Sequence, residues 1–302
     1  QWSTNTLRTV VVTPNNAALS ALRVVRLKDL LAIVCAPIHD TGTTFNLHCT
    51  LLVDDGITLT SSVNTSATTI NIGALDFDDA STEDNFDITR MSDLTAMVCW
   101  RDGSDAFKDG KCVILEVNSA STSMIQKGAT QFIVSSPRTD CASGGYPGAF
   151  DIRVTSITPT SAIVCFTYST SLYLSLTTPP GRLPSCVAIG WSGTDNSLHF
   201  LLDSNSLPVT TGKADYGFAT DINGKLPSNL GIMSPSVAAF TNSTTDRLNF
   251  TNRALYCYET DFRIKNISCT SLILSKDTLP STGPCVNGNR GNTCNVDSNS
   301  VY

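Results

Sequence analysis

The stretch Ala96-Met97-Val98-Cys99 occurs in four versions along a chain of 302 residues. The other versions are Ala32-Ile33-Val34-Cys35, Ala162-Ile163-Val164-Cys165 and Ala254-Leu255-Tyr256-Cys257. Each apolar run is followed by a polar loop and a second apolar run that carries another cysteine. Opposite residues of an antiparallel hairpin lie close enough for a disulfide bond. The pattern therefore predicts four disulfide-bonded hairpins, with the pairs Cys35–Cys49, Cys99–Cys112, Cys165–Cys186 and Cys257–Cys269.

A further strand is expected before each of the first three cysteine runs. The pattern apolar-x-apolar-x-x-apolar recurs there, at 22–27, 86–91 and 152–157. Repeats of this size with three or four strands are typical of β-propeller blades. We expect an all-β fold, a β-propeller-like array of four disulfide-bonded repeats within 15–276, at about 17–77, 85–140, 150–240 and 241–276. The alternative is a set of tandem β-sandwich domains.

The two ends of the chain differ from this repeat. A strand is expected at 6–13 within the segment 1–14, and it has no partner in its own repeat. The fourth repeat is degenerate at its start, where only Leu248 and Phe250 suggest a strand, and its last strand is missing from the pattern. The N-terminal strand therefore either closes the ring within one chain or is donated to the open edge of a neighbour.

The remaining cysteines lie outside the four hairpins. Cys285 and Cys294 are expected to pair and close a small loop in the tail 277–302, and Cys141 is left unpaired within the chain, where it is free, capped or bonded to another subunit. The chain holds eleven cysteines without metal-ligand spacing, which indicates disulfide bonds and an oxidising compartment. We interpret Gln1 as a mature N-terminus left after signal-peptide cleavage.

Composition and sequons support the same compartment. Charged residues make up 15% of the chain and the net charge is −6, with no basic patch to bind nucleic acid. No apolar run approaches the ~18 residues of a membrane span. N-glycosylation is expected at four N-x-S/T sequons, Asn64, Asn242, Asn249 and Asn266. The prediction is a secreted, extracellular glycoprotein.

Few side chains are suited to catalysis. The only histidines are His39, His48 and His199, and none lies in a pattern that completes a triad. The stretch Gly190-Trp191-Ser192-Gly193 lacks the last glycine of a nucleophile elbow. We therefore expect no enzymatic activity and no catalytic residues.

Two stretches are candidate binding sites. Asp76, Asp78 and Asp79 offer alternating carboxylates for Ca²⁺, but the segment lacks the glycine that a calcium loop uses for its sharp turn, so a solvated loop is favoured and no cofactor is expected. Trp100 and Trp191 are possible sugar-binding residues through stacking on a pyranose. Packing between blades is the more frequent role of such tryptophans.

One run of the second repeat resembles a known kind of protein. The sequence Phe86-Asp87-Ile88-Thr89-Arg90-Met91-Ser92-Asp93-Leu94-Thr95-Ala96-Met97-Val98-Cys99-Trp100-Arg101-Asp102 is similar to tandem β-propeller-like repeats of secreted algal and protist proteins. The resemblance covers the first three repeats, and the chain departs from it by a long insertion in the third repeat and by having four units. It implies an extracellular, structural or adhesive setting, and no activity follows from it.

Two functions are consistent with the sequence. The first is an extracellular structural glycoprotein, a subunit of a filament, surface hair or coat that self-assembles through strand and edge contacts. The alternative is a carbohydrate-binding, lectin-like secreted β-propeller whose partners are glycans.

Overall fold

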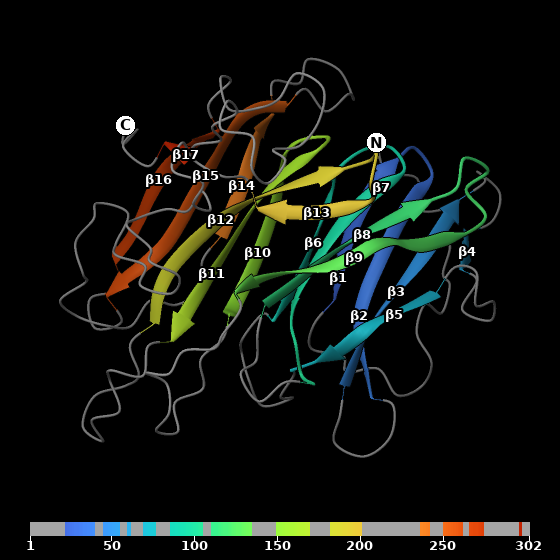
Figure 1. Cartoon of the computed structure of the whole chain (residues 1–302), viewed down its shortest axis with the longest axis horizontal. Helices are drawn as coiled ribbons and strands as arrows, with labels where there is room; N and C mark the ends of the chain where they lie inside the picture. Colours follow the sequence, from blue (N-terminus) through green and yellow to red (C-terminus); the bar gives the residue numbers. More distant parts are fainter. Residues whose placement is uncertain are drawn as a thin grey trace, which may run out of the picture.

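The structure is a computed structural model made of antiparallel β-sheets (Figure 1). It describes residues 22–39, 45–54, 59–61, 69–76, 85–104, 110–134, 149–169, 182–200, 236–241, 250–261, 266–274 and 296–297. The all-β expectation is confirmed for these residues. None of them belongs to a helix long and apolar enough to cross a membrane.

The first sheet contains five strands and follows the first repeat. Its order is β1-β2-β3, and both β4 and β5 pair with the far side of β3. Its strands are β1 (Arg23–Lys28), β2 (Leu31–His39), β3 (Phe45–Asp54), β4 (Leu59–Ser61) and β5 (Thr69–Leu75).

The second and third sheets each contain four strands in chain order. The second consists of β6 (Phe86–Arg90), β7 (Thr95–Arg101), β8 (Gly110–Val117) and β9 (Met124–Val134). The third consists of β10 (Ala149–Thr158), β11 (Ser161–Ser169), β12 (Arg182–Ser192) and β13 (Ser197–Phe200). The region expected to be an insertion from about 190 thus begins with the end of β12 and the whole of β13.

The fourth sheet corrects two expectations about the fourth repeat. Its first strand is β14 (Ser236–Thr241), not the region of Leu248 and Phe250, and it pairs with β15 (Phe250–Asp261). After β16 (Asn266–Leu274), the tail supplies a fourth strand, β17 (Val296–Asp297). The sequence pattern assigns 236–240 to the third repeat, although only the eight residues 242–249 separate β14 from β15, and it shows no last strand because β17 lies far beyond the end of β16.

The predicted disulfide pairs are opposite one another in the central hairpins. Cys35–Cys49, Cys99–Cys112 and Cys165–Cys186 are bonded, with Cα atoms 4.1, 4.1 and 4.0 Å apart. Cys257 is also disulfide-bonded and lies opposite Cys269 in the register.

The sheets stack on one another through two apolar cores. The first core joins the first and second sheets and contains Ile33, Leu47, Val98 and Leu115. The second core joins the second and third sheets and contains Met97, Ile114, Val164 and Ile189. Because the second sheet contributes one face to each core, the sheets do not separate into two tandem sandwiches.

Both of these junctions between sheets use the same pair of faces. We call the face that carries a sheet's disulfide its cysteine face, and the other its opposite face. The cysteine face of the first sheet (Cys35, Cys49) belongs to the first core, and that of the second sheet (Cys99, Cys112) belongs to the second core. The cysteine face of each of these sheets therefore packs on the opposite face of the next sheet.

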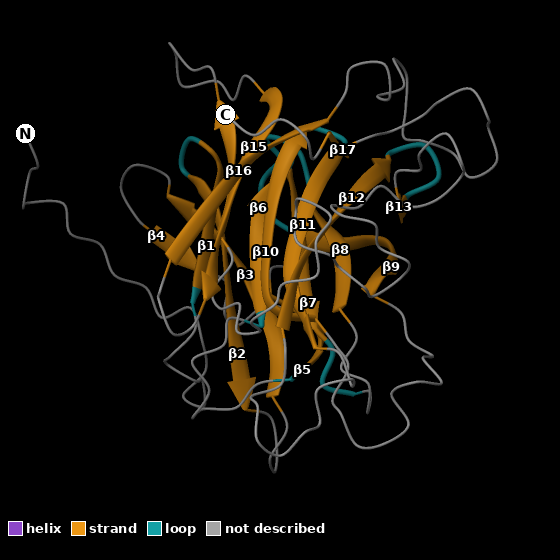
Figure 2. Cartoon of the chain, turned by 90° about the vertical axis from the view of Figure 1, so that its left-hand side faces the viewer, coloured by secondary structure: helices purple, strands orange, loops and turns teal. Residues whose placement is uncertain are grey.

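The first strands of successive sheets are in contact along the middle of the stack. β1 contacts β6, β6 contacts β10, and β10 contacts both β14 and β15. Figure 2 shows β6 and β10 side by side. We refer to β1, β6, β10 and β14 as the inner strands.

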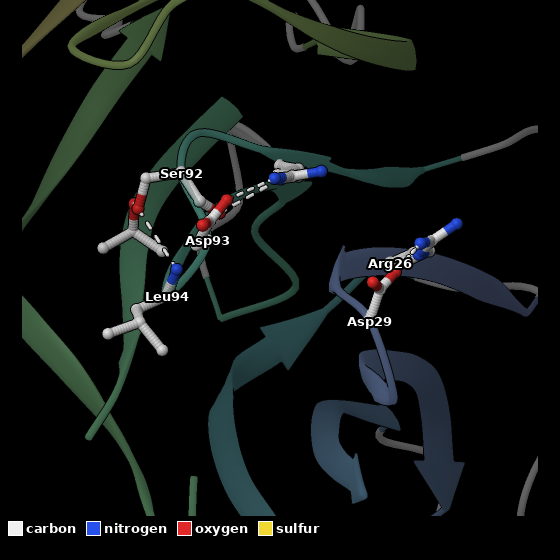
Figure 3. Close-up of polar contacts among 7 residues, drawn as sticks. Arg26, Asp29, Ser92, Asp93 and Leu94 are labelled. Carbon is white, nitrogen blue, oxygen red and sulfur yellow. Dashed lines mark hydrogen bonds and ion pairs between the residues drawn. The ribbon is translucent and has the colours of Figure 1, made fainter. Parts of the chain in front are cut away.

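The turns that follow the inner strands repeat their polar contacts as well. In the first two repeats an arginine forms an ion pair with an aspartate three residues later, Arg26–Asp29 and Arg90–Asp93 (Figure 3). Because one or both partners are exposed, such pairs contribute little stability. The ion pair recurs although the two turns differ, since Leu30 has a φ of 61° and Leu94 in the second repeat has no positive φ.

Candidate functional site

One charged position on the inner strands connects three sheets. Arg23, Asp87 and Arg153 each lie opposite the first cysteine of their repeat, so their positions are equivalent. Arg23 Nε lies 3.7 Å from Asp87 Oδ1, and its guanidinium lies 5.7 Å from the centre of the Phe86 ring. Asp87 Oδ2 accepts a hydrogen bond of 2.9 Å from the Val154 N–H. A single carboxylate thus links the first, second and third sheets.

Side chains of β6 bind the exposed backbone edge of β10. Besides the bond from Val154 to Asp87, the Ser156 N–H donates a hydrogen bond of 3.2 Å to Thr89 Oγ1. Alternate N–H groups of an edge strand point away from its partner and need another acceptor. The second sheet therefore protects the edge of the third through side chains as acceptors.

The titration of Asp87 reflects its position between the sheets. Burial raises the pKa of Asp87 above its ordinary value of 3.8. Hydrogen bonds from the Val154 and Ile88 N–H groups and the charges of Arg153 and Arg23 act in the other direction and are outweighed. The folded protein therefore holds a proton on Asp87 more tightly than the unfolded chain does.

We expect Asp87→Ala to lower the free energy of unfolding by about 1–3 kcal/mol, because the buried Val154 N–H loses its acceptor. Asp87→Asn keeps an acceptor oxygen, so this variant should lose less stability.

The contribution of Asp87 to stability also depends on pH. Since the folded pKa is raised, Asp87 favours folding most below the unfolded value near 3.8, and this contribution is lost as pH rises through the folded pKa. Urea unfolding of both variants across acidic and neutral pH measures these effects.

The comparison with Asp87→Asn isolates the carboxyl group. Relative to this variant, the wild-type protein should lose stability as pH rises, because asparagine does not titrate. A wild-type advantage that instead grows with pH would show that the arginines dominate and that the folded pKa of Asp87 is lowered.

The stretch Trp100–Gly103 joins the second sheet to the first. Arg101 Nη1 lies 2.9 Å from Asp76 Oδ2, just after β5. The Asp76 N–H donates to the Arg101 carbonyl at 3.0 Å, and the Gly103 N–H donates to the Ala74 carbonyl at 3.0 Å. Backbone hydrogen bonds thus connect the end of one sheet to the next.

This joint depends on close approach of the two backbones. A Cβ at Gly103 would lie 2.6 Å from the carbonyl carbon and oxygen of Leu75, so only glycine fits there. Trp100 is 2% exposed and belongs to the first core. Its indole lies against Gly73, where an added Cβ would be 3.6 Å from Trp100 Cζ2.

A second carboxylate is neutralised beside the joint. Asp102 is buried and forms an ion pair with Lys111 and hydrogen bonds with Ser104. Burial alone would raise the pKa of Asp102, but the bonds from Lys111 and Ser104 hold it below its ordinary value. The charges around Trp100 therefore stabilise the junction between repeats.

One of the three predicted calcium ligands forms an ion pair at this joint instead. Asp76 is engaged by Arg101, while Asp78 and Asp79 lie outside the described residues. Among the residues that the structure describes, no group of three or more His, Cys, Asp or Glu side chains could hold a metal ion.

The second tryptophan also lies inside the stack. Trp191 is 7% exposed and belongs to the second core with Leu198. Its backbone N–H donates a hydrogen bond of 2.7 Å to the Thr160 carbonyl. Ser192, the next residue, ends β12 before a hairpin turn, so this stretch is not a strand-to-helix nucleophile elbow. Neither tryptophan presents the open ring face that sugar stacking requires.

The three histidines lie on different strands. His48 is on β3, as expected, and His39 ends β2 with its ring 5.0 Å from that of Phe45. His199 is on β13, half-buried, and burial lowers its pKa despite the charge of Asp195. β13 belongs to the third sheet and the other two strands to the first.

Several predicted sites fall outside the described residues. These are the strand at 6–13, the sequons Asn64, Asn242 and Asn249, and the cysteines Cys141, Cys285 and Cys294. Asn266 is the first residue of β16.

Sequence reasoning missed the contact between Arg23 and Asp87. A signal was present, because the x position that follows the first apolar residue of each inner strand reads Arg23, Asp87 and Arg153. The alternation of charge has meaning only once the inner strands are known to be neighbours.

Comparison with known proteins adds little to this geometry. No family model matches the chain, and no curated protein matches it. Among solved structures, it is similar to a mutant of an α-L-arabinofuranosidase from Fusarium graminearum in complex with an iminosugar inhibitor. The TM-score is 0.40 and the identity is 10%, over 85% of this chain and 62% of that one. A likeness at this level carries no conclusion about activity.

Proposed function

We propose that the protein is an extracellular structural glycoprotein, a subunit of a filament, surface hair or coat, built as an open propeller-like array. The observation that carries the proposal is the last sheet of the stack. Leu255 lies two residues before Cys257 and is 37% exposed, whereas the equivalent Ile33, Met97 and Ile163 are all 0% exposed. The position that forms a core in three repeats is a surface in the fourth.

The backbone pairing agrees with an uncovered terminal face. Ala238 lies opposite Leu255 and is exposed, whereas Ala254 on the other face of the same sheet is fully buried. Arrays of stacked repeats need polar terminal faces to remain soluble as single units. Leu255 and Ala238 give this terminal face an exposed apolar patch, which shares the face with Arg253 and Ser271, and such a patch in a disulfide-bonded array favours self-assembly.

The polar groups support a structural role. The half-buried carboxylate of Asp87 and the buried carboxylate of Asp102 both bind groups that hold sheets or strands together. The lectin alternative rested on Trp100 and Trp191, and the burial of both removes its basis. Disulfide bonds in each of the first three sheets suit an oxidising, extracellular setting.

Electron microscopy and sedimentation of the full-length secreted chain test the proposal. We expect fibres or ordered sheets in micrographs and a sedimenting mass that grows with concentration. Deleting residues 1–14 separates the donated-strand hypothesis from the rest, since only strand donation predicts that this deletion abolishes assembly. A chain that stays monomeric at high concentration would refute the structural role.

A further inference from the structure

The stack has a second, partly uncovered end, at the inner strand on the opposite face of the first sheet. Val24 is 58% exposed there, whereas the equivalent Ile88 and Val154 are 7% and 5% exposed. The residue two positions earlier behaves alike, with Leu22 at 53% and its equivalents Phe86 and Ile152 both at 0%. On the same face, Val34, Ala36 and Thr50 of β2 and β3 are 5%, 4% and 3% exposed, so the uncovered surface is confined to the inner strand β1 and the residue before it.

The two uncovered ends are different faces of the repeat. The first sheet exposes part of its opposite face, and the fourth sheet exposes its cysteine face. These are the same two faces that pack against each other in the first and second cores. The exposed part of each end therefore corresponds to part of one half of a junction that the chain already forms internally.

We propose that the cysteine face of the fourth sheet, around Leu255 and Ala238, binds the opposite face of the first sheet, around Val24 and Leu22, in a second copy of the chain. This inference rests on the proposed structural role and names its contact. The contact is heterologous, because each copy contributes a different face. Copies then add head to tail with one polarity.

The inner strands indicate where the contact is made. Within the chain, successive sheets meet through β1 and β6, β6 and β10, and β10 and β14. The next step in this series brings β14 and β15 of one copy to β1 of the next. At the position of Asp87 the fourth sheet carries Ser236, which lies opposite Cys257, so it places no cation next to Arg23 of the neighbour.

The alternative within one molecule is closure of the stack into a ring. Figure 1 shows β14 to β17 at the left end of the molecule and β1 to β5 at the right end. Exposure of Val24 and Leu255 in the same chain agrees with an open stack. The occupant that fits both ends is therefore another copy.

Two end-blocking variants, mixed, test the contact. We expect Leu255→Lys and Val24→Lys each to remain monomeric in sedimentation at concentrations where the wild-type chain assembles, because every contact needs one intact face of each kind. Mixed in equal amounts, they should form dimers at twice the monomer mass that grow no further, since the contact between their intact faces leaves only blocked ends. Ile125→Lys is the matched control, because Ile125 is 53% exposed on β9, away from both end faces, and it should assemble like the wild-type chain.

The outcomes separate this contact from the proposed function. If Val24→Lys alone forms dimers, like faces bind each other and the head-to-tail contact is wrong. If the wild-type chain assembles and both single variants assemble equally well, the structural role stands and this contact falls. If the wild-type chain never assembles, both fall together. Circular dichroism confirms that each variant is folded.

Discussion

Trp100→Ala lowers the free energy of unfolding by about 3–5 kcal/mol, the range for truncating a large buried aromatic side chain. Trp100 is 2% exposed, and its indole fills the first core against Gly73 and the end of β5. Alanine leaves a cavity there that the disulfide-bonded hairpins cannot readily collapse. Urea or thermal unfolding followed by far-ultraviolet circular dichroism measures the loss.

The same variant distinguishes packing from sugar binding. Trp100→Phe should recover most of the stability, because an aromatic ring still fills the space. A Trp100→Ala protein that is as stable as the wild type but loses binding on a glycan array would reverse our interpretation. Trp191→Ala extends the test to the second core, where the same direction is expected.

Replacing both Cys99 and Cys112 by alanine lowers the free energy of unfolding by about 3 kcal/mol in the chain-entropy model, before any loss of packing. The two cysteines are separated by 13 residues, and both are fully buried in the second core. The unfolded chain gains freedom when this loop is released. Denaturant unfolding under non-reducing conditions measures the difference.

The double substitution also tests the equivalence of the repeats. Cys165 and Cys186 enclose a longer loop, with a sequence separation of 21, so their removal should cost slightly more. Peptide mapping without reduction should show the remaining native pairs unchanged. Rearranged pairs would show that the disulfide directs pairing during folding as well as stabilising the folded state.

The cysteine hairpins were predictable because their signals are local. The strand expected at 22–27 is β1 (Arg23–Lys28), and the one expected at 86–91 is β6 (Phe86–Arg90). Alternating apolar residues, a turn and a cysteine fix such strands within one short window. The pairing of Cys99 with Cys112 then follows from hairpin register.

The strands β14 and β17 were missed for a physical reason. Ser236–Thr241 pairs with β15 across an intervening segment, and Val296–Asp297 pairs with Leu274 and Ile273 from far along the chain. Local pattern carries no information about a partner as distant as that of β17, whereas β14 lies close to β15 but was attributed to the end of the third repeat. The short strand β13 was hidden in the same way, within a region that reads as an insertion.

The charged junction lay beyond sequence reasoning as well. Asp87 and Val154 are 67 residues apart and meet only because the inner strands of neighbouring sheets are adjacent. Burial of Trp100 and Trp191 likewise follows from the stacking of sheets. The sequence of a strand does not distinguish an exposed aromatic residue from a buried one. The roles of Trp100 and Trp191 could therefore be assigned only from the fold.

Under the proposed structural role, the hairpin disulfides have a mechanical consequence. When the chain is pulled from its ends, the segment between bonded cysteines cannot extend, and the force passes across the sulfur bridge. Cys165 and Cys186 are 21 residues apart, so roughly 70 Å of contour length is withheld at that hairpin alone. A fibre made of such units would resist lengthening even after its sheets had separated, and would yield fully only under reducing conditions.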